Sequence, residues 1–180
     1  ESSYTSLTEF RRNNIKLLLS EMYTAIKAEN PNVIFGISPV RNIWMAEYKS
    51  MLDLDTILST EGYIDYICPQ IYEGFSGSNG GFKKVYNSWS NLVKNSNIKL
   101  LAGLWFQDAI DENDEWKNSK DILKRCVEFM EDQPKFSGFA LFCYQNIYST
   151  SGGGRTQDCT EEADNLIKAA KLIPDIRIEY

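Results

Sequence analysis

Gln70, Tyr72 and Glu73 form the densest group of side chains that could perform chemistry, and they follow a short apolar run around Ile67. A carboxylate can accept or move a proton, an amide can bind hydroxyl groups, and a phenol ring can stack on a flat apolar surface. In parallel α/β proteins, side chains that follow the carboxyl end of a strand face the ligand crevice. We therefore expect these three residues to line a polar, aromatic cleft.

Similar side chains follow the other apolar runs of the chain, where cations, amides and flat rings could meet the same ligand. A single ring at such a place could equally be a core or rim residue. The shared position after strand ends is what favours contact with a ligand. These further candidates are Arg41, Trp44, Trp105, Gln107 and Tyr144, with Asp108 as a second, weaker acid.

The chain contains no histidine, which removes several catalytic devices. A Ser-His-Asp or Cys-His arrangement needs that side chain, and so does a zinc site with imidazole ligands. The four cysteines are widely spaced, which predicts small buried side chains rather than a metal site or a disulfide framework. The acidic run 108–115 lacks the spacing of a calcium loop and predicts a solvated loop. We expect no metal ion and no cofactor.

Charge and length limit the class of protein and its partners. The 25 acidic and 19 basic side chains give a net charge of −6, which disfavours nucleic acid as a partner. No apolar run approaches the roughly 20 residues that a membrane span needs. The sequence starts without methionine and without a signal pattern, as expected for a processed end or a boundary within a longer protein.

Helix-period and strand-like segments alternate along the chain. Apolar spacing predicts helices over 6–30, 49–59, 82–93, 119–130 and 160–170, and short apolar runs predict strands over 33–37, 66–72, 99–104 and 139–143. This alternation predicts an α/β fold with a parallel sheet and outer helices. The sheet is either a small open sheet, which could bind an unrelated small molecule, or the C-terminal half of an eight-stranded barrel. A complete barrel typically takes about 250 residues, more than the 180 present.

In the half-barrel interpretation, residues 1–174 form an incomplete domain that supplies barrel strands 5 to 8, and residues 175–180 are a tail or a link to a further segment. Removing half of a barrel leaves sheet edges open, and long apolar edges are hazardous in solution. We therefore expect a partner that covers them, either the missing N-terminal half of the barrel or a second copy of the chain.

Five segments of the sequence together resemble the bacterial glycosyl hydrolase-like family 10. They are Phe10 to Ile15, Ile26-Lys27, Pro31 to Pro39, Ile64 to Tyr72 and Gly138 to Phe142, in that order and spacing. The resemblance implies a (β/α)₈ barrel that hydrolyses glycosidic bonds, with cell-wall peptidoglycan strands as one substrate of such proteins. It also implies a secreted or cell-surface location.

The sequence departs from the family pattern at two places. The family carries paired aspartates just upstream of the Arg-Asn motif, and this chain begins after that point. Glu73 stands where a tryptophan is common, and the segment Val40 to Trp44 keeps only the tryptophan of its region. We expect Asp65, at the amino end of its strand, to be structural.

Glycoside cleavage commonly uses two carboxyl groups, and Glu73 is the best placed acid in this chain. If the ligand is a sugar, as the resemblance implies, its flat faces can stack on Tyr72, Trp105, Trp44 and Tyr144. Its hydroxyls or carboxylates can bind to Gln70, Gln107 and Arg41. Glu73 could also be a solvated loop residue. The alternative function is therefore a carbohydrate-binding or scaffold fragment without catalysis.

Overall fold

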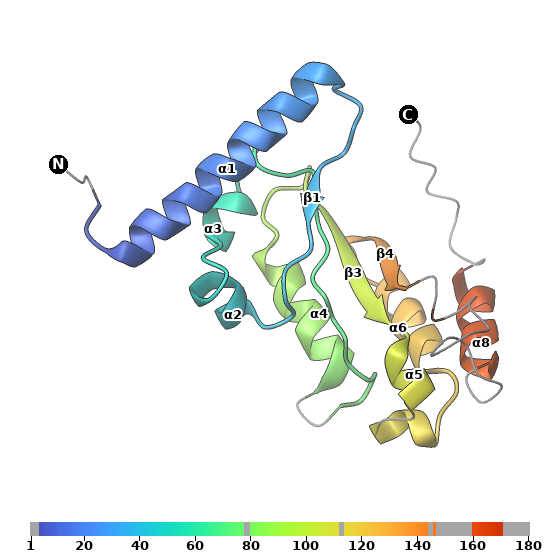
Figure 1. Cartoon of the computed structure of the whole chain (residues 1–180). Coiled ribbons are helices and arrows are strands. Elements are labelled where there is room, and N and C mark those ends of the chain that lie inside the picture. The colour runs from blue at the N-terminus through green and yellow to red at the C-terminus, as the bar shows by residue number, and fades with distance from the viewer. Residues whose placement is uncertain (1–3, 78–79, 112–113, 144–145, 147–159, 171–180) are drawn as a thin grey trace.

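The strands of this protein form one parallel sheet. The computed structural model describes residues 4–77, 80–111, 114–143, 146 and 160–170. In these ranges the strand order is β1-β2-β3-β4, sequential along the chain, and each neighbouring pair is parallel. The predicted parallel α/β class is confirmed (Figure 1). The strands are β1 (Gly36–Ile37), β2 (Tyr66–Ile67), β3 (Lys99–Trp105) and β4 (Phe136–Phe142).

The first two strands are much shorter than expected, and each is followed two positions later by a proline. Proline has no backbone N–H to donate to the ladder, so regular pairing stops near Pro39 and Pro69. Isolated bridges from Gln70 to Val40 and to Gly103 then continue the parallel arrangement. The strand expected over 66–72 therefore starts in the right place but ends early, whereas β1 ends at Ile37 as expected and starts three residues later than position 33.

Helices precede and follow the strands as predicted, with one exception (Figure 1). The first is capped by Ser6, whose Oγ accepts the Glu9 N–H at 3.1 Å. The last described helix starts where the sequence predicted it. The helices are α1 (Leu7–Glu29), α2 (Ile43–Tyr48), α3 (Leu54–Ile57), α4 (Gly81–Leu92), α5 (Gln107–Asp111), α6 (Ile122–Glu131) and α8 (Thr160–Ala170).

The exception is the helix predicted over 49–59, which is wrong in extent. Within that range only α3 is helical, and a second short helix, α2, ends just before it. Met51 between them has a φ of 56°, in the left-handed region that an α-helix does not use. Trp44 consequently lies within a helix rather than in the predicted loop, and the acidic run likewise contains α5 and a short 3-10 helix, η1 (Asp114–Lys117).

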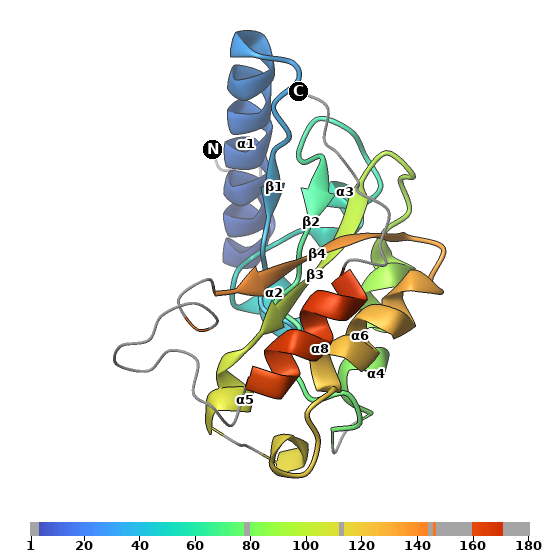
Figure 2. The ribbon, with the colours of Figure 1, turned by 90° about the vertical axis from the view of Figure 1, so that its right-hand side faces the viewer.

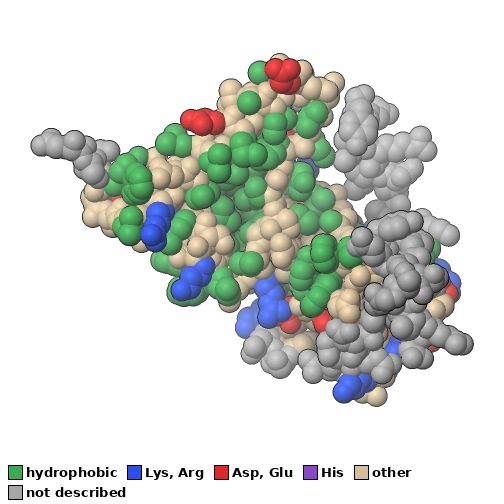
Figure 3. Space-filling view, viewed as in Figure 1, with side chains coloured by type: hydrophobic (Ala, Val, Ile, Leu, Met, Phe, Trp, Pro, Cys, Tyr) green, Lys and Arg blue, Asp and Glu red, His purple; other side chains and the backbone are tan. Residues whose placement is uncertain are grey.

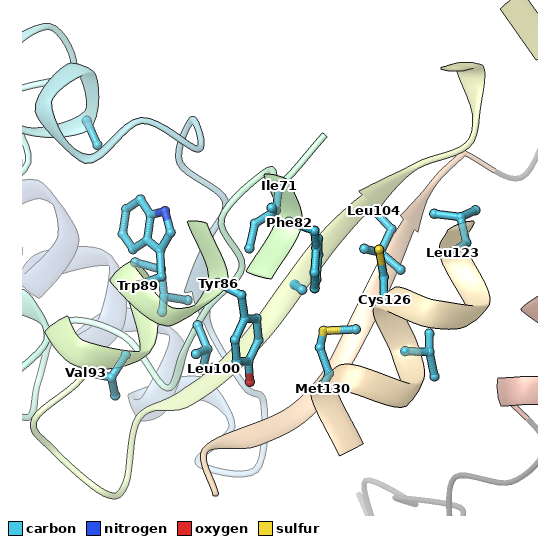
Figure 4. Close-up of a cluster of buried hydrophobic side chains, with 14 of the residues drawn as sticks. Ile71, Phe82, Tyr86, Trp89, Val93, Leu100, Leu104, Leu123, Cys126 and Met130 are labelled. Atoms are coloured by element: carbon cyan, nitrogen blue, oxygen red, sulfur yellow. The ribbon is translucent and has the colours of Figure 1, made fainter. Parts of the chain in front are cut away.

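The main core lies between β3 and the helices α4 and α6. Figure 4 shows Phe82, Tyr86 and Trp89 of α4 beside Leu100 and Leu104 of β3, with Cys126 and Met130 of α6 completing the cluster. All seven are essentially buried. The aromatic residues of α4 thus pack on the sheet, as their helical spacing predicted. Helix α8 packs against α6 on the outside (Figure 2).

A belt of hydrophobic side chains remains exposed elsewhere. Helix α1 buries only Leu19, while Leu7, Leu17, Leu18 and Met22 are at least two-fifths exposed. The belt covers α1 and continues across the middle of the molecule in Figure 3. Strands β1 and β4 form the two edges of the sheet. None of the described helices is long and apolar enough to cross a membrane.

Asp65 has a structural role at the amino end of β2, as predicted. Its carboxylate accepts the Phe35 N–H at 2.7 Å and the Tyr23 hydroxyl at 3.1 Å, and it pairs with Lys27 Nζ at 2.8 Å. Burial alone would raise the pKa of Asp65, but these hydrogen bonds outweigh it and hold the pKa below its usual 3.8. The carboxylate therefore ties α1 to the entries of β1 and β2.

Asp65→Asn is expected to destabilise the protein at neutral pH by about 1–2 kcal/mol, because it removes the ion pair and one charged acceptor. A lowered pKa stabilises the folded state above the ordinary pKa, and this stabilisation is lost as the pH falls through the lowered value. The variant should therefore lose less stability than the parent between pH 5 and 3. Urea unfolding at these pH values, with exposed Asp55→Asn as control, tests both statements; equal unfolding of parent and Asp65→Asn would contradict them.

Candidate functional site

The carboxyl ends of the four strands meet at one edge of the sheet. The backbone of Gln70 bridges Val40 on one side and Gly103 on the other, and Trp105 at the end of β3 pairs with Phe142 at the end of β4. The segments that follow the strands therefore lie side by side at this edge (Figure 1). This is the edge at which the sequence placed the ligand site.

Arg41 and Glu73, from the segments after β1 and β2, form an ion pair. Arg41 Nη1 lies 2.6 Å from Glu73 Oε1 and also donates to the carbonyl oxygen of Tyr72 at 3.0 Å. The indole Nε1 of buried Trp89 donates to the carbonyl oxygen of Arg41 at 2.8 Å. A core side chain of α4 thus fixes the backbone that carries the arginine, and the arginine in turn fixes Glu73.

Three aromatic rings from successive strand ends form a cluster beside this pair. The Tyr72 ring centroid lies 5.4 Å from that of Trp105 and 6.3 Å from that of Phe142. The Tyr72 and Phe142 rings are inclined by only 26°, and Phe142 is 56% exposed. Together the rings offer apolar surface that solvent reaches, and a flat ligand face can stack on such a surface.

Protonation at the cluster is set by burial. Burial raises the pKa of Tyr72, with a smaller contribution from the neighbouring thiols Cys68 and Cys143, so its hydroxyl stays protonated at neutral pH and can donate a hydrogen bond. Burial also raises the pKa of Cys68 to about 11. This cysteine is therefore a neutral thiol and has no thiolate nucleophile to offer.

Two amides complete the polar part of the edge. Gln70 Nε2 donates to the Ser38 carbonyl oxygen at 3.1 Å, and Gln107 Oε1 accepts from Asn146 Nδ2 at 3.0 Å. Asn146 Oδ1 also lies 3.4 Å from Cys143 Sγ. These contacts join the segments after β3 and β4 and hold both glutamines at the strand ends.

The other candidates have different surroundings. Trp44 is 56% exposed and stacks on Tyr48 in α2, with ring centroids 5.6 Å apart, so it belongs to a separate aromatic pair. Asp108 lies in α5, directly after Gln107. Tyr144 lies outside the described residues, as does the predicted tail 175–180.

Two residues at this edge escaped the sequence analysis. Phe142 was interpreted as part of a buried strand, although its position at a strand end is the same signal that identified Tyr72 and Trp105. Glu115 was assigned to a solvated loop, yet its carboxylate accepts the backbone N–H groups of Phe75 and Ser76. Nothing in the local sequence indicates a contact across 40 residues.

A cavity of about 420 Å³ lies away from the strand ends, between the start of α1 and Asp53. Its polar lining is largely paired within itself, since Lys16 Nζ lies 2.7 Å from Asp53 Oδ2 and Asn13 Nδ2 donates to the Tyr4 hydroxyl at 2.6 Å. We therefore place the candidate site at the strand ends, where aromatic surface and a paired carboxylate occur together.

The described residues contain no group of three or more Cys, Asp or Glu side chains that could hold a metal ion. The groups in place at the strand ends are a carboxylate beside a guanidinium, neutral amides, a phenol and exposed rings. This set can bind hydroxyl groups and flat apolar faces, and the carboxylate can accept a proton.

The curated proteins that this chain resembles include two glycosyl hydrolases. The glycosyl hydrolase DigH of Escherichia coli K12 is 27% identical over 159 residues, which cover 78% of this chain and 36% of DigH. The glycosyl hydrolase YngK of Bacillus subtilis is 29% identical over 118 residues, covering 57% of this chain and 23% of YngK. The chain thus spans about a third of the length of DigH.

The family model described as glycosyl hydrolase-like 10 matches residues 2–119, which include β1, β2, β3 and the segments that carry Arg41, Tyr72, Glu73 and Trp105. This match covers well over half of the chain. The protein therefore belongs to the glycosyl hydrolase-like 10 family.

Proposed function

We propose that this chain forms one wall of a glycoside hydrolase site that acts on bacterial glycans. The observation that carries the proposal is the cluster of Tyr72, Trp105 and Phe142 beside the Arg41–Glu73 ion pair. Sugar rings present flat C–H faces and hydroxyl edges, so they need stacking surfaces next to hydrogen-bonding groups. The family relationship supports the same class of substrate.

The side chains take distinct roles in this proposal. The three rings stack on sugar faces, and Tyr144 adds to them. Gln70 and Gln107 bind hydroxyl groups, while Arg41 binds hydroxyls or a carboxylate of the glycan. Trp44, which lies in α2, contacts a more distant sugar unit of the same glycan.

Glu73 is the carboxylate of the reaction. Its partner Arg41, at 2.6 Å, fixes the position of the carboxyl group, and in our proposal Glu73 serves as the nucleophile or as the base that activates water rather than as the proton donor. The second carboxyl group, which protonates the leaving oxygen, comes in our proposal from an upstream segment of a longer protein. The chain by itself would then bind glycans without cleaving them.

The same proposal accounts for the open sheet. Strands β1 to β4 would be barrel strands 5 to 8, and the upstream half would cover the edge of β1, the exposed face of α1 and the edge of β4. The greater length of DigH and YngK is consistent with such a segment. We further propose a location outside the cytoplasm, where cell-wall glycan strands are accessible.

Phe142→Ala is expected to weaken glycan binding by about three- to tenfold, the usual contribution of one stacked ring. Because Phe142 is 56% exposed, the melting temperature should change little. Isothermal titration with N-acetylglucosamine oligosaccharides and with soluble peptidoglycan strands measures the affinity. Phe10→Ala, which removes a half-exposed ring of α1, is the matched control.

Wild-type protein that binds neither glycan would contradict the proposed function. Unchanged affinity of Phe142→Ala would remove this ring from the site. Tight binding without cleavage by the complete protein would instead favour a carbohydrate-binding role without catalysis.

A further inference from the structure

The loop after Glu73 is fixed on one side by the carboxylate of Glu115, which comes from the segment after β3. Glu115 lies in η1, beyond the end of β3. Its Oε1 accepts the Phe75 N–H at 2.7 Å, and its Oε2 accepts the Ser76 N–H at 2.9 Å. Both oxygens of one side chain thus bind successive backbone donors, which fixes the orientation of that backbone segment.

The backbone at Gly74 is in direct contact with the same carboxylate. A Cβ atom built on Gly74 would lie 3.0 Å from Glu115 Cδ and 3.1 Å from its Cγ, closer than ordinary van der Waals contact. An alanine at position 74 would therefore require the Glu115 side chain to shift by a few tenths of an ångström. The absence of a side chain at Gly74 leaves room for the carboxylate in its present place.

Cations of α4 and α6 hold the ring of Phe75. Lys83 Nζ lies 4.4 Å from the ring centroid and the Arg125 guanidinium carbon lies 4.9 Å from it. Arg125 Nη2 also lies 3.8 Å from Glu115 Oε1, and Arg125 Nε forms an ion pair with Asp121 Oδ1 at 3.1 Å. The Glu115 carboxylate and the Phe75 ring therefore both contact Arg125.

Helix α4 fixes the loop from its other end. The Phe82 N–H donates to the Gly74 carbonyl oxygen at 3.0 Å. Gly81 has a φ of +54°, and a Cβ atom there would lie 2.6 Å from the carbonyl oxygen of Phe75. Residues 74–76 are thus restrained on both sides, by Glu115 and by the start of α4.

We propose that Glu115 is a positioning residue that sets the place of Tyr72 and Glu73 in the glycan site. The inference rests on the proposed function for the ligand, and on the contacts of Glu115 with Phe75 and Ser76 for the restraint. Tyr72 and Glu73 immediately precede the restrained segment, so a loop that moves would change the distance from Glu73 to Arg41 and the angle of the Tyr72 ring. Holding both fixed before binding saves ordering entropy when a glycan arrives.

The test uses two independent changes to one contact. Glu115→Ala removes the acceptor, and Gly74→Ala displaces it by steric pressure from the opposite side. In Glu115→Ala, amide hydrogen exchange at Phe75 and Ser76 should become about tenfold faster or more, because each amide loses a charged acceptor. In Gly74→Ala the exchange should also become faster, but by less, because the acceptor is shifted and not removed. Glu115→Gln retains one acceptor oxygen, so its exchange rates at Phe75 and Ser76 should lie between those of the parent and those of Glu115→Ala.

Glycan affinity provides the functional readout. Titration with N-acetylglucosamine oligosaccharides should show binding about three- to tenfold weaker in Glu115→Ala and Gly74→Ala, with exchange in the core strand β3 unchanged. The double variant should be no worse than Glu115→Ala alone, since the added Cβ then meets no carboxylate. Glu128→Gln on α6, an exposed acid that pairs with Lys124, is the control.

The outcomes separate the inference from the proposed function. Unchanged exchange at Phe75 and Ser76 in both variants would overturn the restraint. Faster exchange together with unchanged affinity would overturn the positioning role. Faster exchange in a protein that binds no glycan at all would leave the restraint standing and reject the proposed function.

Discussion

Glu73→Gln is expected to lower the rate of glycan cleavage by about 10²- to 10⁴-fold in the longer protein that supplies the second acid. Glutamine has nearly the same shape and can still accept a hydrogen bond from Arg41, but it cannot act as an ionised nucleophile or base. The affinity for glycan should change by much less than the rate, because the rings and amides remain. Release of soluble fragments from purified glycan strands measures the rate.

A variant of the ion-pair partner, Arg41, tests the same role of Glu73. Arg41 Nη1 contacts both Glu73 Oε1 and the Tyr72 carbonyl oxygen, so Arg41→Lys should lower the rate by misplacing the carboxylate while keeping a positive charge beside it. Raising the pH should not rescue Glu73→Gln, because no titratable group remains there.

Controls separate Glu73 from other acids. Glu21→Gln on the exposed surface of α1 should cleave at the parental rate. Asp108→Asn tests the competing acid after β3. A parental rate in Glu73→Gln would show that Glu73 is a loop residue, and measurable cleavage by these 180 residues alone would contradict the half-barrel proposal.

Much of the fold could be predicted from the sequence because it depends on local periodicity. The apolar spacing of α4 and α6 identified the residues that later pack on β3, such as Trp89 and Met130. The parallel sheet with outer helices followed from the alternation of helices and strands. Strand length was less predictable, since Pro69 interrupts the ladder within the run predicted as the strand 66–72.

The site was predictable in part for a related reason. Position after a strand end identified Tyr72 and Trp105, and the structure brings their rings within 5.4 Å of each other. Contacts between distant loops have no such signal. Glu115 accepts the backbone N–H of Phe75, 40 residues earlier, only because the segments after β2 and β3 converge. An acidic run has the same sequence pattern whether or not one of its members makes such a contact.

Glu162 is a buried acid that the sequence analysis did not single out. It is fully buried in α8, and its carboxylate accepts the N–H groups of Ile122 at 3.1 Å and Leu123 at 2.6 Å. These donors belong to the first turn of α6, which receives no side-chain cap from Asp121. Glu162 therefore caps one helix from another and links α8 to α6.

Burial raises the pKa of Glu162 from 4.5 to about 7, although the two backbone N–H groups favour the ionised form. Asp121 raises the pKa further and Arg125 opposes it. The folded protein thus holds a proton that the unfolded chain has lost between pH 4.5 and 7. The contribution of Glu162 to stability is therefore largest below this window and falls as the pH rises through it, by up to about 3 kcal/mol in total.

Urea unfolding of the parent and of Glu162→Gln between pH 5 and 8 checks this expectation. Glutamine is neutral throughout, so the variant should lack the fall in stability, and the two curves should differ in slope below pH 7. The chain has no histidine, so no imidazole titrates in this window and obscures the result. Glu161→Gln, which removes the adjacent exposed acid, should keep the parental slope. Parallel curves for the parent and Glu162→Gln would show that Glu162 is ionised in the folded protein across the whole range, with the first turn of α6 compensating fully for burial of its charge.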